Sequence, residues 1–503
     1  MAKAPALYLG GTYALDGAGA ASDLLLPAHH LVTHGVVVGM TGSGKTGLTT
    51  VMIEEALRSG VPVLAIDVKG DLPNLLLAFP DFDPARFLPW VEGCSTAEET
   101  RSADEIARAL GEERQSALEA WGINAAELAR FTSTTEVRVI TPGSSAGEPL
   151  HLLSSLERRS PRWDRDPESA RAALSAAISL VLKLIGRESD PAKSKEHVLL
   201  ALLAERHFQA GRAADLDSLL HDLAEPPIDR VGALPLNDFI SRSDRKSLAA
   251  ALNTLLASPT FASWREGAPL DVDSWLTPRE GRTPAVVLSV AHLEDAERAL
   301  VLGVVLEEIL AWTRSLPGTH KLRALVVFDE VYGFLPPHPA NPPTKRPLVA
   351  LMKQARAFGV GVILATQNPM DLDYRALSNA GVWCIGRLQT DADRARVLDG
   401  LAASIGEDKE ALAALTRTVQ RLAPRWFVIR DVHVPNGIAL LQPRCAMSLL
   451  RGPMTRAELR TAREEHAKVI GRALEPPSGG VIAAVTGVVN GGARAVNAMA
   501  NLN

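Results

Sequence analysis

Short runs of branched apolar residues alternate along the chain with longer stretches of mixed character. Six runs are rich in Val, Ile and Leu and are followed by polar residues, Gly or Pro: Val63–Ile66, Val137–Ile140, Val286–Val290, Leu325–Phe328, Gly361–Ala365 and Val382–Ile385. Continuous apolar runs of this length are typical of parallel strands that are buried on both faces. The pattern therefore predicts an α/β fold with a doubly wound, mostly parallel sheet covered by helices.

Two later apolar runs predict a different kind of strand pair. Trp426–Arg430 and Ile438–Leu441 flank the segment Val434–Gly437, which contains an Asn-Gly pair. Asn-Gly is favoured in the tight turns that join antiparallel strands. We therefore expect an antiparallel hairpin at one edge of the sheet.

The apolar period becomes helical between Leu153 and Thr283. The apolar residues Leu174, Ile178, Val181, Leu182 and Ile185 recur at helical spacing, and Val198–Phe208 continues as a second helix. We expect residues 154–283 to form a helical insertion that splits the α/β core into residues 31–153 and 284–450. A short segment, residues 1–30, precedes this core, and a tail, residues 451–503, follows it.

The composition says more about the partners and the location of the protein than about its fold. The 503 residues are 47% hydrophobic and carry a formal net charge of −5. Any nucleic-acid contact must therefore depend on a local positive surface. The three cysteines, Cys94, Cys384 and Cys445, lack metal-ligand spacing, and no apolar stretch is long enough to span a bilayer. We expect a reduced, cytoplasmic protein without stable membrane insertion.

A complete phosphate-binding loop follows the strand predicted at His34–Val38, and a helix is predicted to leave it over Gly47–Ser59. The loop and the first helical position supply the expected nucleotide contacts: Gly39, Thr41, Gly42, Ser43, Gly44, Lys45, Thr46 and Gly47. The glycines let backbone N–H groups converge on phosphates, and the helix N-terminus adds partial positive charge. Lys45 is expected to reach the β and γ phosphates of ATP, and the Thr46 hydroxyl to hold Mg²⁺.

An acidic pair at the end of a predicted strand complements the loop. Leu325–Phe328 runs directly into Asp329 and Glu330, which places two carboxylates at the carboxyl edge of the sheet, where ligands bind. We expect Asp329 to contact the metal and Glu330 to polarise the attacking water. The alternative is an acidic pair that caps the next turn.

Three further polar residues are candidates for the same reaction. Gln367 follows the strand Gly361–Ala365 and is placed to sense the γ phosphate or its water, although it could equally be a loop residue. Arg356 is expected on the preceding helix, where it could stabilise phosphate charge in a neighbouring subunit. Arg387 competes for that role, and the alternative for each Arg is a surface position.

With these residues in place, the chain resembles the HerA/FtsK superfamily of ring-forming P-loop motor ATPases, which have a RecA-like core. More narrowly it is similar to bacterial HerA-like ATPases that lack the N-terminal β-barrel. The segments that carry the resemblance are Gly39–Thr46, Ile66–Leu72, Phe328–Glu330, Ala355–Pro369 and Trp383–Asp393. The chain before the loop is too short for the barrel of HerA proper, so the nuclease partnership of HerA is not carried over, although a nuclease or other effector remains a possible partner.

The resemblance implies an assembly and a substrate. Members of the superfamily form homo-hexameric rings that draw double-stranded DNA through a pore, with the Arg at the position of Arg356 inserted in trans and Gln367 acting as the sensor. We expect Lys345 and Arg346, in the Pro-rich segment Pro336–Pro347, to form a positive collar around the DNA. A solvated surface loop is the equal alternative.

One more charged cluster follows the second predicted strand. Asp67, Lys69 and Asp71 lie at the carboxyl edge of the sheet, so they could order a neighbour's site or the pore, or simply form salt bridges in a turn. The sequence therefore favours an ATP-hydrolysing DNA translocase or helicase-like motor. A motor that acts on protein, as in secretion, and a nucleotide-switched assembly scaffold are the alternatives.

Overall fold

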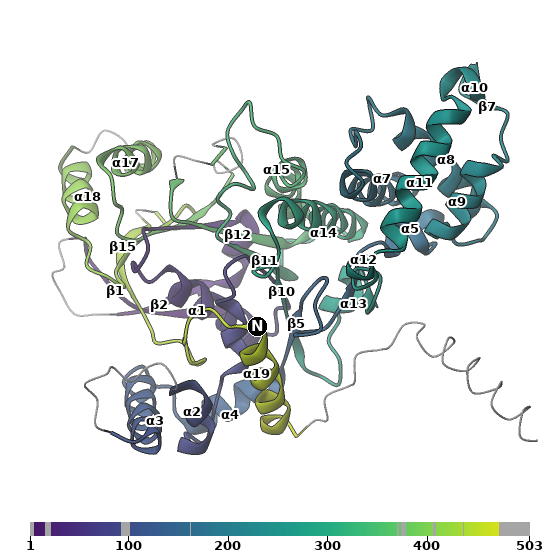
Figure 1. Cartoon of the computed structure of the whole chain (residues 1–503). Coiled ribbons are helices and arrows are strands. Elements are labelled where there is room, and N and C mark those ends of the chain that lie inside the picture. The colour runs from purple at the N-terminus through teal and green to yellow at the C-terminus, as the bar shows by residue number, and fades with distance from the viewer. Residues whose placement is uncertain are drawn as a thin grey trace, which may run out of the picture. The chain divides into compact units, whose positions relative to one another are not determined.

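The computed structural model describes residues 5–15, 22–91, 101–160, 162–369, 372–373, 379–405, 409–435 and 437–471. Within them, eleven strands form one mixed sheet in the order β2-β1-β15-β14-β13-β3-β12-β11-β4-β10-β5 (Figure 1). Clustering of contacts divides the chain into two units. The first contains the sheet and comprises residues 1–140, 162–176 and 271–472, and the second comprises residues 141–161, 177–270 and 473–503.

The strands from β13 to β5 in that order are all parallel. They are β13 (Val382–Ile385), β3 (Gly35–Val38), β12 (Val360–Thr366), β11 (Ala324–Asp329), β4 (Val63–Asp67), β10 (Thr283–Ser289) and β5 (Thr135–Ile140). Nearly all of their residues are buried, which explains why their sequences are continuously apolar. The predicted doubly wound, mostly parallel sheet is confirmed, and all six predicted runs are strands.

The predicted hairpin is present, but it does not lie at the edge of the sheet. β14 (Phe427–Asp431) and β15 (Ile438–Pro443) pair antiparallel, while Asn436 of the expected turn lies outside the described residues. β1 (Ala6–Tyr13) pairs with β15, and β2 (Ser22–Pro27) pairs with β1. The N-terminal segment therefore covers the open backbone groups of β15. Leu7 and Leu9 of β1 are fully buried.

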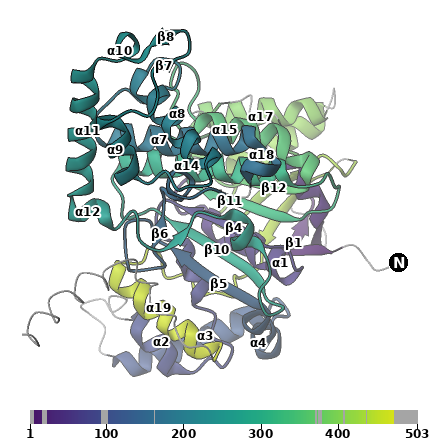
Figure 2. The ribbon, with the colours of Figure 1, turned by 90° about the vertical axis from the view of Figure 1, so that its right-hand side faces the viewer.

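Helices lie on both faces of the sheet. α14 (Asp295–Ser315) and α15 (Lys345–Gln354) are on one side, whereas α1 (Lys45–Arg58) and α19 (Arg456–Val469) are on the other (Figure 2). The remaining helical elements of this unit are η1 (Ala28–Thr33), η2 (Leu72–Leu76), α2 (Pro84–Val91), α3 (Ala103–Glu119), α4 (Ala125–Thr134), α6 (Arg162–Arg165), α13 (Val272–Leu276), η3 (Ala355–Phe358), α17 (Asp391–Ile405) and α18 (Lys409–Arg421).

The second unit is mainly helical. Its elements are β6 (Leu150–His151), α5 (Ser154–Glu157), α8 (Lys195–Gln209), α9 (Leu216–Ala224), β7 (Arg230–Val231), β8 (Leu234–Pro235), α10 (Leu236–Phe239), α11 (Arg242–Leu256), α12 (Pro259–Ala262) and β9 (Ala268–Pro269). α7 (Pro167–Leu184) begins in the residues of the first unit and ends in those of the second. α7 and α8 coincide with the two helices predicted here, and the division into an insertion at 154–283 stays a prediction. Most of the tail predicted at 451–503 lies outside the described residues.

Among the described helices, none combines the length and the apolar character needed to cross a bilayer.

Candidate nucleotide site

The phosphate loop runs from the end of β3 to the start of α1. Gly42 and Gly44 adopt positive φ angles of 76° and 97°, a conformation that side chains other than glycine rarely adopt. Gly44 caps α1 without a side-chain hydrogen bond, so the first N–H groups of the helix are left for a ligand. Thr46 and Gly47, in the first turn, line the adjoining pocket.

Backbone contacts hold the loop against two neighbouring strands. Gly39 N–H donates to the carbonyl of Thr366 at 3.2 Å, and Met40 N–H donates to the carbonyl of Arg387 at 2.8 Å. A Cβ atom at position 39 would lie 2.6 Å from Ser43 Oγ, so Ser43 would have to shift to admit another residue there. The loop is therefore tied to the ends of β12 and β13 as well as to its own strand.

Lys45 is held inside the loop. Its side chain is buried, and its ammonium donates to the carbonyls of Gly39 and Met40. Burial lowers the pKa of Lys45 to about 8, while Glu330 and Asp329 act in the opposite direction. A buried ammonium held by neutral carbonyls gains when an anion arrives, so the geometry fits a phosphate group.

Two carboxylates meet where β4 and β11 end. Asp67 and Asp329 are register partners on these neighbouring parallel strands, and both are buried. Burial, and to a smaller extent the nearby Asp67 and Glu330, raise the pKa of Asp329 to about 7. Burial also raises the pKa of Asp67 to about 6. A cation would relieve this concentration of negative charge, so the pair fits a divalent metal beside the loop.

The metal site is incomplete when only side chains are counted. Among the described residues, no group of three or more His, Cys, Asp or Glu side chains is arranged to hold a metal ion. Mg²⁺ is commonly bound through one or two carboxylates together with water and substrate phosphates.

Hydrogen bonds through Gln367 connect Glu330 to the phosphate loop. The side-chain amide of Gln367 donates to Glu330 Oε2 at 2.9 Å, and the Thr41 hydroxyl donates to Gln367 Oε1 at 2.6 Å. Lys69 Nζ lies 2.7 Å from the same Glu330 oxygen. Glu330 also has a φ of 59°, a strained conformation for this residue type that is often found at functional sites. The structure thus brings together residues that the sequence placed in four separate motifs.

Arg356 lies at the opposite end of the strands from the phosphate loop. It belongs to η3, directly before β12, whereas Gln367 directly follows β12. The predicted single helix ends at Gln354, so Arg356 is in a 3₁₀ turn instead. A seven-residue strand is roughly 20 Å long, which separates Arg356 from the phosphate loop of its own chain. The Arg356 side chain is exposed, as is that of Arg387, which follows β13.

The expectation for Lys345 is wrong. Lys345 is the first residue of α15 and is buried, with Nζ 3.3 Å from Asp373 Oδ2 and 3.0 Å from the carbonyl oxygen of Ala340. An ammonium held in this way is not available to a DNA backbone. Arg346 is 73% exposed and has a long contact of 3.6 Å with Glu307, so it remains the candidate of the two.

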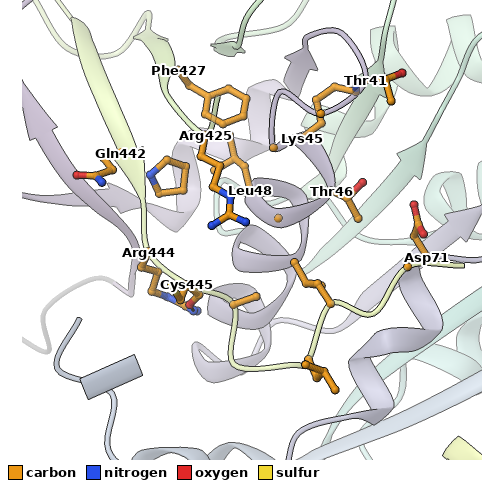
Figure 3. Close-up of a pocket in the computed structure, with 18 of the residues that line it drawn as sticks. Thr41, Lys45, Thr46, Leu48, Asp71, Arg425, Phe427, Gln442, Arg444 and Cys445 are labelled. Carbon is orange, nitrogen blue, oxygen red and sulfur yellow. Dashed lines mark hydrogen bonds between the residues drawn. The ribbon is translucent and has the colours of Figure 1, made fainter. Parts of the chain in front are cut away.

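The sequence did not reveal the rest of the pocket. A cavity of about 720 Å³ adjoins the loop and the start of α1 (Figure 3). Its lining also includes Trp121, Arg425, Phe427, Gln442, Pro443, Cys445, Leu449, Leu450 and Pro453. Trp121 follows α3 and Arg425 directly precedes β14, whereas the others come from β14, β15 and the segment that follows β15. No motif marks them, because they meet the loop only after the sheet has formed.

A buried ion network fixes one wall of this pocket. Arg444 contacts Glu54 Oε2 at 3.0 Å and Glu55 Oε1 at 2.9 Å, with both acids on α1. Glu54 also accepts hydrogen bonds from Met447 N–H and Ser448 N–H, each at 2.9 Å. The helix that leaves the phosphate loop therefore also anchors the segment behind β15.

Comparison with known proteins finds a matching family model for the part of the chain that contains the phosphate loop. Residues 17–79, which include the phosphate loop, match the family model described as helicase HerA-like C-terminal. Over this part of the chain, the match confirms the resemblance to the HerA/FtsK superfamily. No curated protein sequence matches the chain.

Several solved structures are also similar. VirB4 of Thermoanaerobacter pseudethanolicus has 14% identity, covers 89% of this chain and 98% of that one, and gives a TM-score of 0.47. The unbound bacterial conjugative coupling protein TrwB has 13% identity, covers 91% of each chain and gives 0.48. TrwB in complex with ADP and Mg²⁺ has 14% identity, covers 90% and 92%, and also gives 0.48.

Proposed function

We propose that this protein is an ATP-hydrolysing motor of the HerA/FtsK type that acts as a homo-oligomeric ring on double-stranded DNA. The observation that carries the proposal is the hydrogen-bonded chain from Thr41 through Gln367 to Glu330. It joins the phosphate loop to the acidic pair across β12, as a nucleotide hydrolase requires.

The phosphate loop and the acidic pair would hold ATP and Mg²⁺. Lys45 and the open N–H groups of α1 are the phosphate contacts, and Thr46 with Asp329 are the metal contacts. The bound metal neutralises charge that develops on the phosphates. The raised pKa of Asp329 means that the free site disfavours its own negative charge, so metal binding and ionisation of Asp329 support each other.

Glu330 is the residue that would orient the attacking water. Lys69 and Gln367 both contact the same carboxylate oxygen of Glu330, Oε2, rather than Oε1. One oxygen is thereby fixed while the other can accept a hydrogen bond from water. Gln367 also contacts Thr41 of the loop, so its position depends on the state of the loop.

The position of Arg356 supports a ring. Arg356 is exposed and precedes β12, whereas the phosphate loop of the same chain lies at the other end of that strand. Stabilisation of phosphate charge by Arg356 would therefore occur in trans, on the nucleotide of a neighbouring subunit. A closed homo-hexamer, expected from the resemblance, places each Arg356 at a neighbour's site.

The family match favours DNA as the substrate. The matching model describes a helicase domain, and Arg346 offers an exposed cation on an otherwise acidic chain. In a ring, copies of one such cation form a collar that binds the phosphate backbone. Two parts of α15 are exposed, Arg346 at its start and one face of its last turn. These are the surfaces to test first for DNA binding.

The deciding experiment measures ATP turnover with and without duplex DNA at low salt. We expect duplex DNA to stimulate turnover and Arg346→Ala to reduce that stimulation while leaving basal turnover unchanged. Arg421→Ala, at an exposed site on α18, is the matched control. Glu330→Gln, which keeps the size of the side chain, should remove basal turnover.

Two results would redirect the proposal. If neither duplex nor single-stranded DNA changes ATP turnover at low salt, the hypothesis of a DNA substrate is contradicted. A protein substrate or an assembly scaffold is then favoured. Turnover that survives in Glu330→Gln would contradict the catalytic assignment. Association with a nuclease or another effector is a separate question, which co-purification would address.

A further inference from the structure

The pocket beside the phosphate loop continues into a region that a phosphate chain would not fill. Besides the phosphate loop, its lining includes the apolar residues Pro443, Leu449, Leu450 and Pro453, the aromatic Trp121, and the two arginines Arg114 and Arg444. The apolar and aromatic side chains among them suit the planar, partly polar base of a nucleotide better than they suit charged phosphates. This end of the pocket therefore faces the nucleoside part of the ligand.

Arg425 lies between the two ends of the pocket and is fixed by its backbone. Its N–H donates to the carbonyl of Ser43 at 2.9 Å, and its φ is 64°. A Cβ atom on Gly44 would lie 3.1 Å from Arg425 Cα, so the two backbones are in close contact. The left-handed conformation and this contact hold Arg425 directly against the phosphate loop.

The guanidinium of Arg425 is free to meet a ligand. The residue is exposed, and no carboxylate of the described chain forms an ion pair with it. Figure 3 shows the guanidinium beside α1, on the side of the pocket where Arg444 and Cys445 lie, and away from Thr41 and Asp71. The phosphate and metal contacts are on the other side, around Lys45 and Thr46.

We propose that Arg425 binds the base of ATP in cis, with its guanidinium stacked on the aromatic face of the base. This inference rests on the proposed function and specifies how its site holds the nucleoside. A planar guanidinium stacks well on aromatic rings, and an Arg fixed by its backbone loses less freedom on binding. Because every base has an aromatic face, this contact adds affinity for the nucleoside without selecting among purines.

The test compares ATP with inorganic tripolyphosphate, which lacks the nucleoside. Both ligands are titrated into the full-length protein by calorimetry in the presence of Mg²⁺. We expect Arg425→Ala to weaken ATP binding about tenfold, the usual loss for a base-stacking contact, and to leave tripolyphosphate binding within about twofold. Arg421→Ala, a few residues earlier on α18, should change neither affinity.

Arg425→Lys separates stacking from charge. Lysine keeps the positive charge but lacks the planar group, so we expect it to bind ATP as weakly as Arg425→Ala does. Full ATP affinity in Arg425→Lys would overturn the stacking contact. Equal weakening of ATP and tripolyphosphate by Arg425→Ala would show a phosphate contact instead, and unchanged ATP affinity would show no contact.

The same titrations distinguish this inference from the proposed function. Wild-type protein that binds neither ligand would contradict nucleotide binding itself, and the stacking contact with it. Wild-type protein that binds both, with no difference between the ligands in Arg425→Ala, would contradict only the role of Arg425.

Discussion

Lys69 Nζ lies 2.7 Å from Glu330 Oε2 and forms an ion pair with it. The turn that carries Lys69 is built by Asp67, whose buried carboxylate accepts hydrogen bonds from Gly70 N–H, Asp71 N–H and the Ser289 hydroxyl. The sequence suggested that this cluster orders a pore or a neighbour's site. The structure directs Lys69 to Glu330 of its own chain.

Lys69→Met should therefore reduce the maximal rate of ATP hydrolysis by about tenfold, because loss of the ion pair leaves the Glu330 carboxylate less well positioned. The affinity for ATP should change little, since Lys69 contacts Glu330 rather than the phosphate loop. Lys69→Arg should restore much of the rate, and Lys321→Met, at an exposed position, should have no effect. A rate unchanged in Lys69→Met would remove Lys69 from the positioning of Glu330.

The features that the sequence predicted are those that depend on local pattern. Buried parallel strands are continuously apolar, so all six runs were recognisable, and the phosphate loop and Asp329-Glu330 are contiguous motifs at strand ends. β1 was missed because Gly10 and Gly11 interrupt its apolar pattern in the middle of the strand.

Other features depend on partners that are distant in the chain. Lys345 was expected to be exposed because it lies in a Pro-rich segment, yet its burial is explained by Asp373, which approaches it only in the folded protein. Arg425 and Gln442 line the pocket because β14 and β15 pass near the phosphate loop. Such contacts have no signature in a single sequence.

Mixing two inactive variants tests the position of Arg356. Glu330→Gln and Arg356→Ala should each lose most ATP turnover, but mixed rings should recover a measurable part of it. Recovery is expected because some interfaces in a mixed ring pair an intact Glu330 site with an intact Arg356 from the neighbour. The measurement is turnover after subunit exchange, with mixed rings verified by two affinity tags. Verified mixed rings that show no recovery would contradict action in trans.

The buried contacts of Arg444 predict a large effect on stability. Arg444→Met would leave Glu54 and Glu55 buried without their cation, and breaking a buried ion pair in this way typically costs about 3–5 kcal/mol. We expect a loss of that size in the free energy of unfolding, measured in urea by tryptophan fluorescence.

A matched control is available for Arg444. Arg451 forms an ion pair with Glu458 at a partly exposed site, so Arg451→Met should cost less than about 1 kcal/mol. Similar losses in the two variants would show that burial does not set the strength of the Arg444 contacts. Because Arg444 also lines the nucleotide pocket, bound ATP should protect the wild-type protein more than the variant.

The docking of α19 predicts a dependence of stability on pH. His466 on α19 is buried and its ring Nδ1 lies 3.2 Å from the carbonyl oxygen of Leu76. Burial lowers the pKa of His466 from 6.5 to about 4. Because the folded state disfavours the charged ring, the contribution of His466 to stability is fully present above pH 6.5 and is lost progressively as the pH falls from 6.5 to about 4. By linkage, about 2 kcal/mol of it should be gone at pH 4.5.

His466→Gln keeps a donor for the Leu76 carbonyl but cannot titrate in this range. Urea unfolding at pH 7.5 and pH 4.5 should therefore show a smaller loss of stability in His466→Gln than in the wild type, by about 2 kcal/mol. The exposed His320 serves as the control, and His320→Gln should follow the wild type. His34, whose pKa burial also lowers to about 4, remains in every variant, so part of the acid sensitivity should persist. Equal losses in His466→Gln and the wild type would show that protonation of His466 does not destabilise the docking of α19.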